Sequence, residues 1–448
     1  MYGAKKSWDN FYQFQRKGET MKSRALLASI LALVTIAAAW AGAEAETTDQ
    51  VVMRMSDNQP DRTVTWGAVI EEINAEFVAQ HPTVVFETES YPDQPYQEKI
   101  RIYATAGQLP DVMKYWSFST LMHPLIESGL IAPLDMAALE GLDWLPGALE
   151  SNMYQGQLYG IPVSGDLWVV YYNQAILDEV GIEPPRSFDE LYAAVPLLDA
   201  AGYVPMVTNG RDGWPLSITY DTIFWRLTGD YSLMRDALAG EKPFTDPEFV
   251  EAAEIFQEFF HSSGVFASDL AVTDYGAARN LFGAGRAAMY LMGSWELGLA
   301  ADTNFSDQFR QNVRATIFPQ VSNGSGTTDQ LVAWFGGNYI VSSATPNMEL
   351  AMDYIQTYAQ LYPDLVWARQ AAFPAQTVEP SQDDTQVARD LLAIAADASQ
   401  TSGTPALDSL TPAFKAAHER LSRDLAAGII TPREFAQGLQ EAIEEVYR

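Results

Sequence analysis

One fifteen-residue segment, Tyr159–Asn173 (YGIPVSGDLWVVYYN), combines the residue types that a polar, ring-shaped ligand needs. It opens with a Gly-Ile-Pro break and a short polar stretch, and an apolar and aromatic run from Leu167 to Tyr172 follows. This run predicts a buried strand. Asp166 and Trp168 would then lie at the mouth of the strand. There a carboxylate can accept hydrogen bonds from hydroxyl groups and an indole can cover an apolar ring face.

Tryptophans beside small residues or proline are the other aromatic candidates. Phe282–Trp295 (FGAGRAAMYLMGSW) repeats the pattern, because a second apolar run ends in Gly-Ser-Trp. The candidate aromatic ligand contacts are Trp116, Trp168, Trp214, Trp295 and Trp334. The sequence places Trp116, Trp214 and Trp295 at junctions between a strand and a loop, which favours ligand contact over a place in the core. For Trp168 and Trp334 the interior of a strand is an equal alternative.

Polar residues follow the first expected strands of the chain. Asp57 and Asn58 come after an apolar strand at Val51–Met55, and Tyr115 lies with Trp116 just beyond another expected at 110–113. Ligands of open α/β sheets bind outside the carboxyl ends of the strands, so these residues are predicted to share one edge. A simple Asx turn accounts equally well for Asp57 and Asn58.

Backbone and charged candidates complete the predicted site. Gly336 and Gly337 allow the chain to approach a ligand closely or to bend at a hinge. Arg369 precedes a Phe-Pro loop and is also a candidate, with a surface salt bridge as the alternative. For Asp166 the alternative is a strand-end cap or a hinge contact.

Helical and strand patterns alternate along the chain, which predicts an α/β fold. Val69, Ile70, Ile73, Phe77 and Val78 recur at helical spacing, between the strand at 51–55 and another at 84–86. A second α/β region begins after residue 162. In that region Ser187–Glu190 and Thr431–Glu434 read as helix N-terminal caps, and Asp246-Pro247 as a helix start.

Composition excludes several classes of function. The 448 residues are 48% hydrophobic, enough for two domains with cores. The chain has no cysteine, which removes disulfides and thiolate metal sites, and its four histidines lack metal-ligand spacing. We therefore predict no metal and no cofactor. A net charge of −31 disfavours nucleic acid and anionic membranes as partners. Hydrolase, nucleotide-binding and metalloprotease motifs are absent, so we do not predict an enzyme.

The N-terminal segment predicts export. Lys22 and Arg24 precede an apolar run, Ala25–Ala39, and small residues offer a cleavage site after Ala45. Residues 1–45 are therefore interpreted as an upstream extension followed by a signal peptide that starts at Met21. Because the cleavage site has no cysteine, we expect a free periplasmic protein without a lipid anchor.

The two tryptophan-containing segments resemble the extracellular solute-binding proteins of sugar ABC importers, the maltose-binding type known as family 1. The resemblance runs from about residue 50 to the C-terminus. It implies the two-lobed type II periplasmic binding protein fold, in which two doubly wound sheets are joined by a multi-strand hinge. On that pattern the chain crosses between lobes near 160–165, 333–337 and 373–378. One lobe then comprises 46–161 and 336–375, and the other 162–335 and 376–448.

The same resemblance implies a function. A sugar or oligosaccharide would bind between the lobes and pass to the transmembrane subunits of an ABC permease, with the binding protein acting as a monomer. A secreted carbohydrate-active enzyme (a hydrolase or lyase) is the alternative from another class. A ligand-sensing partner of a membrane receptor would keep the fold and change the task. Among binding proteins, polyamine or metal ligands also stay open.

Overall fold

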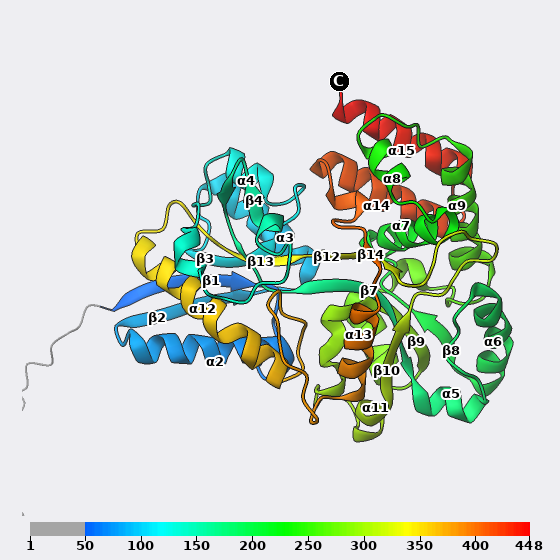
Figure 1. The fold of residues 1–448 in the computed structure, drawn as a ribbon, viewed down its shortest axis with the longest axis horizontal. Helices are drawn as coiled ribbons and strands as arrows, with labels where there is room; N and C mark the ends of the chain where they lie inside the picture. The colour runs from blue at the N-terminus through cyan, green and yellow to red at the C-terminus, as the bar shows by residue number, and fades with distance from the viewer. Residues whose placement is uncertain (1–49) are drawn as a thin grey trace, which may run out of the picture. The chain divides into compact units, whose positions relative to one another are not determined.

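The computed structural model describes residues 50–448, so the predicted extension and signal peptide at 1–45 lie outside the described residues. The first of two five-stranded sheets has the order β2-β1-β3-β13-β6 (Figure 1). Its strands are β1 (Val51–Asp57), β2 (Val84–Ser90), β3 (Val112–Trp116), β6 (Ile161–Pro162) and β13 (Gly337–Val341). Strand β3 pairs in parallel with β1 and antiparallel with β13, so the sheet is mixed.

Helices α2 (Thr65–Gln80) and α12 (Met348–Ala368) pack against each other beside the first sheet. The predicted apolar face of α2 is confirmed, because Val69, Ile70, Ile73 and Phe77 are all buried. Tyrosine rings fill the space between α12 and β13, with Tyr339 and Tyr358 centroids 4.2 Å apart. This sheet therefore has a hydrophobic core of its own.

The second sheet contains the two segments predicted as buried strands. Its order is β10-β7-β9-β8, and β12 pairs with the start of β7. Its strands are β7 (Gly165–Asn173), β8 (Val204–Val207), β9 (Ala287–Gly293), β10 (Val313–Ile317) and β12 (Ala333–Phe335). Every residue of β9 is buried, and β7 runs antiparallel to β9, β10 and β12.

The other helices lie outside the two sheets, and the short strands pair as β4 with β5 and β11 with β14. Helices are α3 (Asp93–Ala106), α4 (His123–Glu127), α5 (Gln174–Val180), α6 (Phe188–Ala201), α7 (Trp214–Thr228), α8 (Ser232–Leu238), α9 (Pro247–Gln257), α10 (Tyr275–Gly283), α11 (Asp307–Asn312), α13 (Gln386–Ala396), α14 (Pro412–Ala426) and α15 (Pro432–Val446). Short strands are β4 (Met153–Tyr154), β5 (Gln157–Leu158), β11 (Gln330–Leu331) and β14 (Gln400–Thr401). A 3₁₀ helix, η5 (Ser294–Ala300), follows β9. Within residues 50–448, no helix combines the length and hydropathy needed to cross a bilayer.

The predicted helix starts are mostly confirmed. Thr431 and Glu434 form a full capping box at α15. Ser187 caps α6 by accepting from the Glu190 amide at 3.2 Å, but the Glu190 carboxylate accepts from the Arg186 amide instead of completing the box. Helix α9 begins at Pro247 as expected, while the Asp246 carboxylate binds Lys242 rather than the helix.

Three chain segments lie side by side where the two sheets meet. The chain leaves β6 and enters β7 across residues 163–164, and it returns from β12 to β13 at Gly336. Beside them, the Gly165 amide donates to Phe373 O (3.2 Å) and the Ala375 amide to Val163 O (3.3 Å). Figure 1 shows β7 and β12 in this position between the sheets.

Two local predictions were wrong at strand ends. Tyr115 and Trp116 belong to β3 rather than lying beyond it, because β13 extends the ladder to the pair Trp116–Gly337. Asp57 likewise belongs to β1 rather than following it, because the strand continues past Met55 and pairs Ser56 with Met113.

Candidate functional site

A cavity of about 620 Å³ is lined by residues from both sheets. Strands β3 and β13 of the first sheet and β7 and β12 of the second all contribute to its wall. Its volume falls within the range that small-molecule sites occupy. Five tryptophans line it: Trp66, Trp116, Trp214, Trp295 and Trp334.

Three of these tryptophans form one aromatic wall. Trp214 opens α7, Trp295 lies in η5 and Trp334 in β12, which bring together residues distant in the chain. Ring centroids are 5.7 Å apart for Trp214 and Trp295 and 5.9 Å for Trp295 and Trp334. Trp168, 2% exposed, packs behind them at 6.2 Å from both Trp214 and Trp295.

A second aromatic group, Trp116 on β3 and Trp66 on α2, lies against a lysine. The Lys114 ammonium lies 4.4 Å from the ring of Trp116 and 5.3 Å from that of Trp66. Lys114 is only 4% exposed, and burial lowers its pKa to about 8, although the carboxylates of Asp93 and Asp166 act in the opposite direction. Cation–π attraction helps to hold a desolvated ammonium in such a place.

Asp166 projects into the cavity from β7, next to β12. Its backbone is paired with Trp334, and the side chain is 6% exposed. Oδ2 accepts from the Ser164 hydroxyl at 3.3 Å, whereas Oδ1 is buried and has no hydrogen-bond partner among residues 50–448. Burial raises the pKa of Asp166 to about 7, against the effect of Lys114. Burial also raises the pKa of Asp93, at the start of α3, to about 6.

The other cations of the cavity wall are held in ion pairs. Arg279 on α10 contacts Glu296 at 2.9 Å and Asp302 at 2.8 Å. Lys415 on α14 contacts Asp408 at 2.9 Å and Glu419 at 3.0 Å. These two carboxylates raise the pKa of Lys415 above its usual range despite burial. These ion pairs hold Arg279 and Lys415 in the cavity wall. Lys114 has no such ion pair within the described residues.

A larger hollow of about 930 Å³ lies among α6, β10 and α13. Of its described lining residues, Tyr172 alone is aromatic. Aromatic rings and converging polar groups mark the smaller cavity instead, so we take that cavity as the candidate site.

Residues 59–360 match the family of bacterial extracellular solute-binding proteins, which is more than half of the chain. The protein belongs to this family. The maltotriose-binding protein of Pyrococcus abyssi is 26% identical over 236 residues, covering 52% of this chain and 48% of that protein. The multiple sugar-binding protein of Streptococcus mutans is 23% identical over 269 residues, covering 58% and 61%. This solute-binding protein thus spans about half the length of the curated relatives it matches.

Solved structures show the same fold. One, from a study of xylan utilization by Caldanaerobius polysaccharolyticus, superposes with a TM-score of 0.79 at 24% identity, covering 87% of this chain and 99% of that one. A chitin oligosaccharide binding protein gives 0.77 at 19% identity, covering 89% and 99%. The predicted fold class is therefore confirmed: two mixed sheets in the arrangement of type II periplasmic binding proteins.

Seven residues predicted as ligand contacts line the cavity of this solute-binding protein: Asn58, Trp116, Asp166, Trp214, Trp295, Trp334 and Gly337. Five others do not: Asp57, Tyr115, Trp168, Gly336 and Arg369. Tyr115 is buried against Tyr96 and Trp116. Arg369 lies on the surface and pairs with Glu72.

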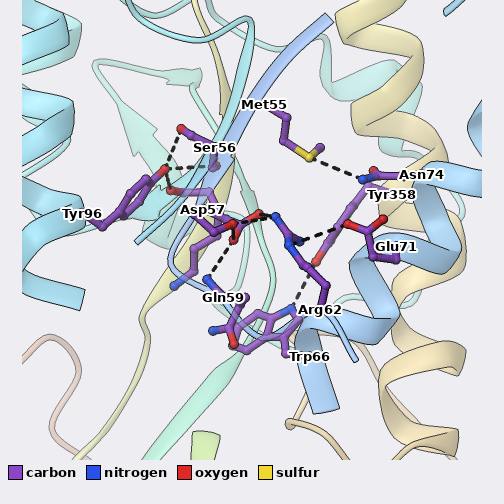
Figure 2. Close-up of polar contacts among 12 residues, drawn as sticks. Met55, Ser56, Asp57, Gln59, Arg62, Trp66, Glu71, Asn74, Tyr96 and Tyr358 are labelled. Carbon is purple, nitrogen blue, oxygen red and sulfur yellow. Dashed lines mark hydrogen bonds and ion pairs between the residues drawn. The ribbon is translucent and has the colours of Figure 1, made fainter. Parts of the chain in front are cut away.

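Asp57 supports the site from behind the cavity. Figure 2 shows its carboxylate accepting from the Gln59 amide (2.8 Å) and from Arg62 (2.5 Å). These contacts hold the loop that carries Asn58 to the cavity. Arg62 also contacts Glu71 at 3.6 Å, which ties the loop to α2.

Sequence reasoning missed several residues of the wall, among them Trp66, Asp93, Lys114, Arg279 and Lys415. Lys114 carried a usable signal, because a lysine inside an apolar strand is costly unless something compensates its charge. Trp66 carried none, since a tryptophan at the start of an amphipathic helix is an ordinary core residue. Within the described range, no three His, Cys, Asp or Glu side chains converge as a metal site would require.

Proposed function

We propose that this protein binds a sugar or oligosaccharide in the tryptophan-lined cavity and delivers it to the transmembrane subunits of an ABC permease. One observation carries the proposal: five tryptophans line one cavity. Trp66 and Trp116 come from α2 and β3, and Trp214, Trp295 and Trp334 come from α7, η5 and β12. Sugar rings present apolar C–H faces, which such indoles cover, and hydroxyl rims, which polar groups bind.

Polar groups in the wall match a hydroxyl-rich ligand. Asp166 Oδ1 is a buried acceptor and Trp214 Nε1 a buried donor, and neither has a hydrogen-bond partner within the described chain. Leaving such groups without partners costs free energy, so a ligand that supplies hydroxyls gains affinity by pairing with them. The names of similar proteins agree with this chemistry, since they refer to maltotriose, to multiple sugars and to chitin oligosaccharides.

Ligand binding would act by closing two lobes on each other. We assign 46–161 and 336–375 to one lobe and 162–335 and 376–448 to the other, with the three neighbouring segments near 163, 336 and 374 as the hinge. Contacts made only in the closed form shift the population toward it. Converting a mostly open population into a mostly closed one needs about 5 kcal/mol of differential binding, which several stacked rings and hydrogen bonds supply.

The cellular setting follows from the same proposal. The family is extracellular. For this protein we propose a periplasmic location without a lipid anchor, a monomeric state, and docking of the closed form on the permease.

A titration of purified protein with neutral trisaccharides tests the proposal. We expect one of maltotriose, xylotriose or triacetylchitotriose to raise the melting temperature and to bind in calorimetry, with compaction in small-angle scattering. Trp116→Ala and Trp214→Ala should each weaken binding at least about tenfold, because each removes a stacking face. Trp144→Ala is the matched control, since this half-buried tryptophan lies outside the cavity.

Unchanged affinity in both cavity variants, or binding without compaction, would count against the proposal. Chromatography of the recovered sugar separates the enzyme alternative, because a transport protein returns its ligand intact.

A further inference from the structure

The cations that line the cavity differ in how their charges are balanced. Arg279 and Lys415 each contact two carboxylates within 3.0 Å. Lys114, by contrast, makes no ion pair within 4.0 Å and donates no hydrogen bond to any of residues 50–448, although it is 4% exposed. Its ammonium lies against the faces of Trp66 and Trp116, which supply no lone pairs for its N–H groups. A ligand is therefore the natural acceptor for those donors.

Asp166, on the second sheet, is an acceptor without enough partners, just as Lys114 is a donor without them. Its Oδ1 atom is buried without a hydrogen-bond partner inside the described range, and Oδ2 has a single contact with Ser164. A carboxylate in this state accepts hydrogen bonds and donates none when it is ionised. When Asp166 is ionised, the cavity thus contains a buried acceptor, Asp166 Oδ1, that has no partner within the described residues, together with the donor-only ammonium of Lys114, a residue that is 4% exposed.

The diglycine between β12 and β13 brings both groups to one place. A Cβ atom on Gly336 would lie 2.4 Å from Asp166 Oδ2, and one on Gly337 would lie 3.2 Å from Lys114 Cε and 3.6 Å from Lys114 Nζ. Lys114 and Asp166 therefore occupy the space beside two consecutive residues without side chains. Both groups also line the same cavity, so a sugar bound there can contact the two of them together.

A pair of hydroxyls fits this arrangement better than a charged substituent does. One hydroxyl oxygen accepts from Lys114 and a neighbouring O–H donates to Asp166, so both buried groups are satisfied while their charges balance each other. A carboxylate on the ligand would gain Lys114 but meet Asp166 as a like charge. An ammonium would gain Asp166 but meet Lys114. Each charged ligand therefore brings a like charge close to one of the two buried groups, which is unfavourable.

We propose that Lys114 and Asp166 form a diol clamp that makes this site select uncharged sugars over uronic acids and amino sugars. This inference rests on the proposed function and adds the chemical class of the ligand. Specificity in the clamp comes from repulsion as well as attraction, because each member rejects the ligand charge that the other would attract.

Calorimetry with three classes of trimer tests the clamp. The neutral probes are maltotriose, xylotriose and triacetylchitotriose, the anionic probe is trigalacturonate, and the cationic probe is the chitosan trimer. All are titrated into wild-type protein at about pH 7.5, between the pKa of Asp166 (about 7) and that of Lys114 (about 8), where both groups are mostly charged. We expect the tightest ligand to be a neutral trimer, with both charged trimers at least tenfold weaker. Lys114→Met should weaken the neutral ligand by tenfold or more. Lys99→Met is the control, because Lys99 lies on α3 outside the cavity, over the ring of Tyr103.

The decisive result is a shift of selectivity in opposite directions. Lys114→Met should improve the affinity for the chitosan trimer relative to the neutral ligand, and Asp166→Asn should improve the relative affinity for trigalacturonate. A role in folding alone cannot produce opposite shifts. Circular dichroism checks folding, and Lys114→Gln replaces Lys114→Met if the latter does not fold.

The outcomes separate the two proposals. Absence of binding by all the neutral and charged trimers would overturn the proposed function and the clamp with it. Wild-type protein that binds a charged trimer as well as a neutral one would overturn the clamp alone. The same holds if the two variants shift selectivity in the same direction.

Discussion

Arg279 provides a direct test of how the cavity wall is held together. Its guanidinium contacts Glu296 at 2.9 Å and Asp302 at 2.8 Å, and the two carboxylates are only 4% and 1% exposed. Arg279→Met would leave two buried charges unpaired. Breaking a buried pair in this way costs about 3–5 kcal/mol, most of it from the uncompensated charge. Glu296 adjoins Trp295, so the loss would fall on the aromatic wall.

The size of the effect sets the assay. The entropy of unfolding is about 2.1 cal/mol/K per residue, or roughly 0.8 kcal/mol/K for about 400 residues. A loss of about 4 kcal/mol then lowers the melting temperature by roughly 5 °C. Urea unfolding at pH 7, followed by tryptophan fluorescence, measures the free energy itself. Arg420→Met is the matched control, since its exposed pair with Asp424 at 3.4 Å contributes only about 0.5 kcal/mol.

Two results bear on the reasoning. Combining Arg279→Met with Glu296→Gln and Asp302→Asn should recover most of the lost stability, because the triple variant has no unpaired charge at this place. If Arg279→Met costs less than about 1 kcal/mol, no more than Arg420→Met, then the ion pairs do not hold the wall.

Further predictions concern pH and the diglycine. Burial raises the pKa of Asp221 to about 7, so its folded form retains a proton that the unfolded chain loses near its usual value of 3.8. The contribution of Asp221 to stability is therefore greatest at low pH and is lost as pH rises through 7. From pH 5 to pH 8, we expect the free energy of unfolding of Asp221→Asn to rise by roughly 2–3 kcal/mol relative to wild type in urea unfolding. A difference that does not change with pH would contradict this. Burial lowers the pKa of His418 to about 3. The contribution of His418 to stability is therefore fully present above its usual pKa of 6.5 and is lost as pH falls toward 3. In the same assay, His418→Phe should make the loss of stability between pH 6.5 and pH 3 less steep. Gly336→Ala should weaken sugar binding, because the added Cβ would displace the Asp166 carboxylate. Gly165→Ala is the control, since its Cβ would make only ordinary contacts of 3.6 Å or more. Equal sugar affinities for the two variants would refute the argument that Asp166 needs the space beside Gly336.

Local patterns predicted much of the fold. The apolar face of α2, the buried strands β7 and β9, and the caps at Ser187 and Thr431 all follow from spacing within one element. Such signals depend on residues a few positions apart, so the sequence shows them directly. The two-sheet arrangement came from a family resemblance rather than from these patterns.

Distant pairing explains what local patterns could not predict. Strand β3 continues through Trp116 because β13, about 220 residues later, runs beside it. That extension places Lys114 between two tryptophans, one of them on a helix that looked like ordinary core. Likewise, nothing near Arg279 in the sequence indicates that its partners lie in and after η5. The aromatic residues of the cavity could therefore be predicted from the sequence more easily than its charged residues, such as Lys114 and Arg279.

The pairing of β3 with β13 also has a consequence for biosynthesis. At about 5–20 residues per second, a ribosome needs roughly ten seconds or more to add β13 after β3 has emerged. Until then the first sheet lacks the strand that joins β3 to β6, and the nascent chain cannot compact around it. We expect chains arrested before residue 337 to be digested readily by protease and chains arrested well beyond α12 to gain protection. A chain that stays loose for this long remains suitable for threading through a translocation channel, as export of an extracellular protein requires.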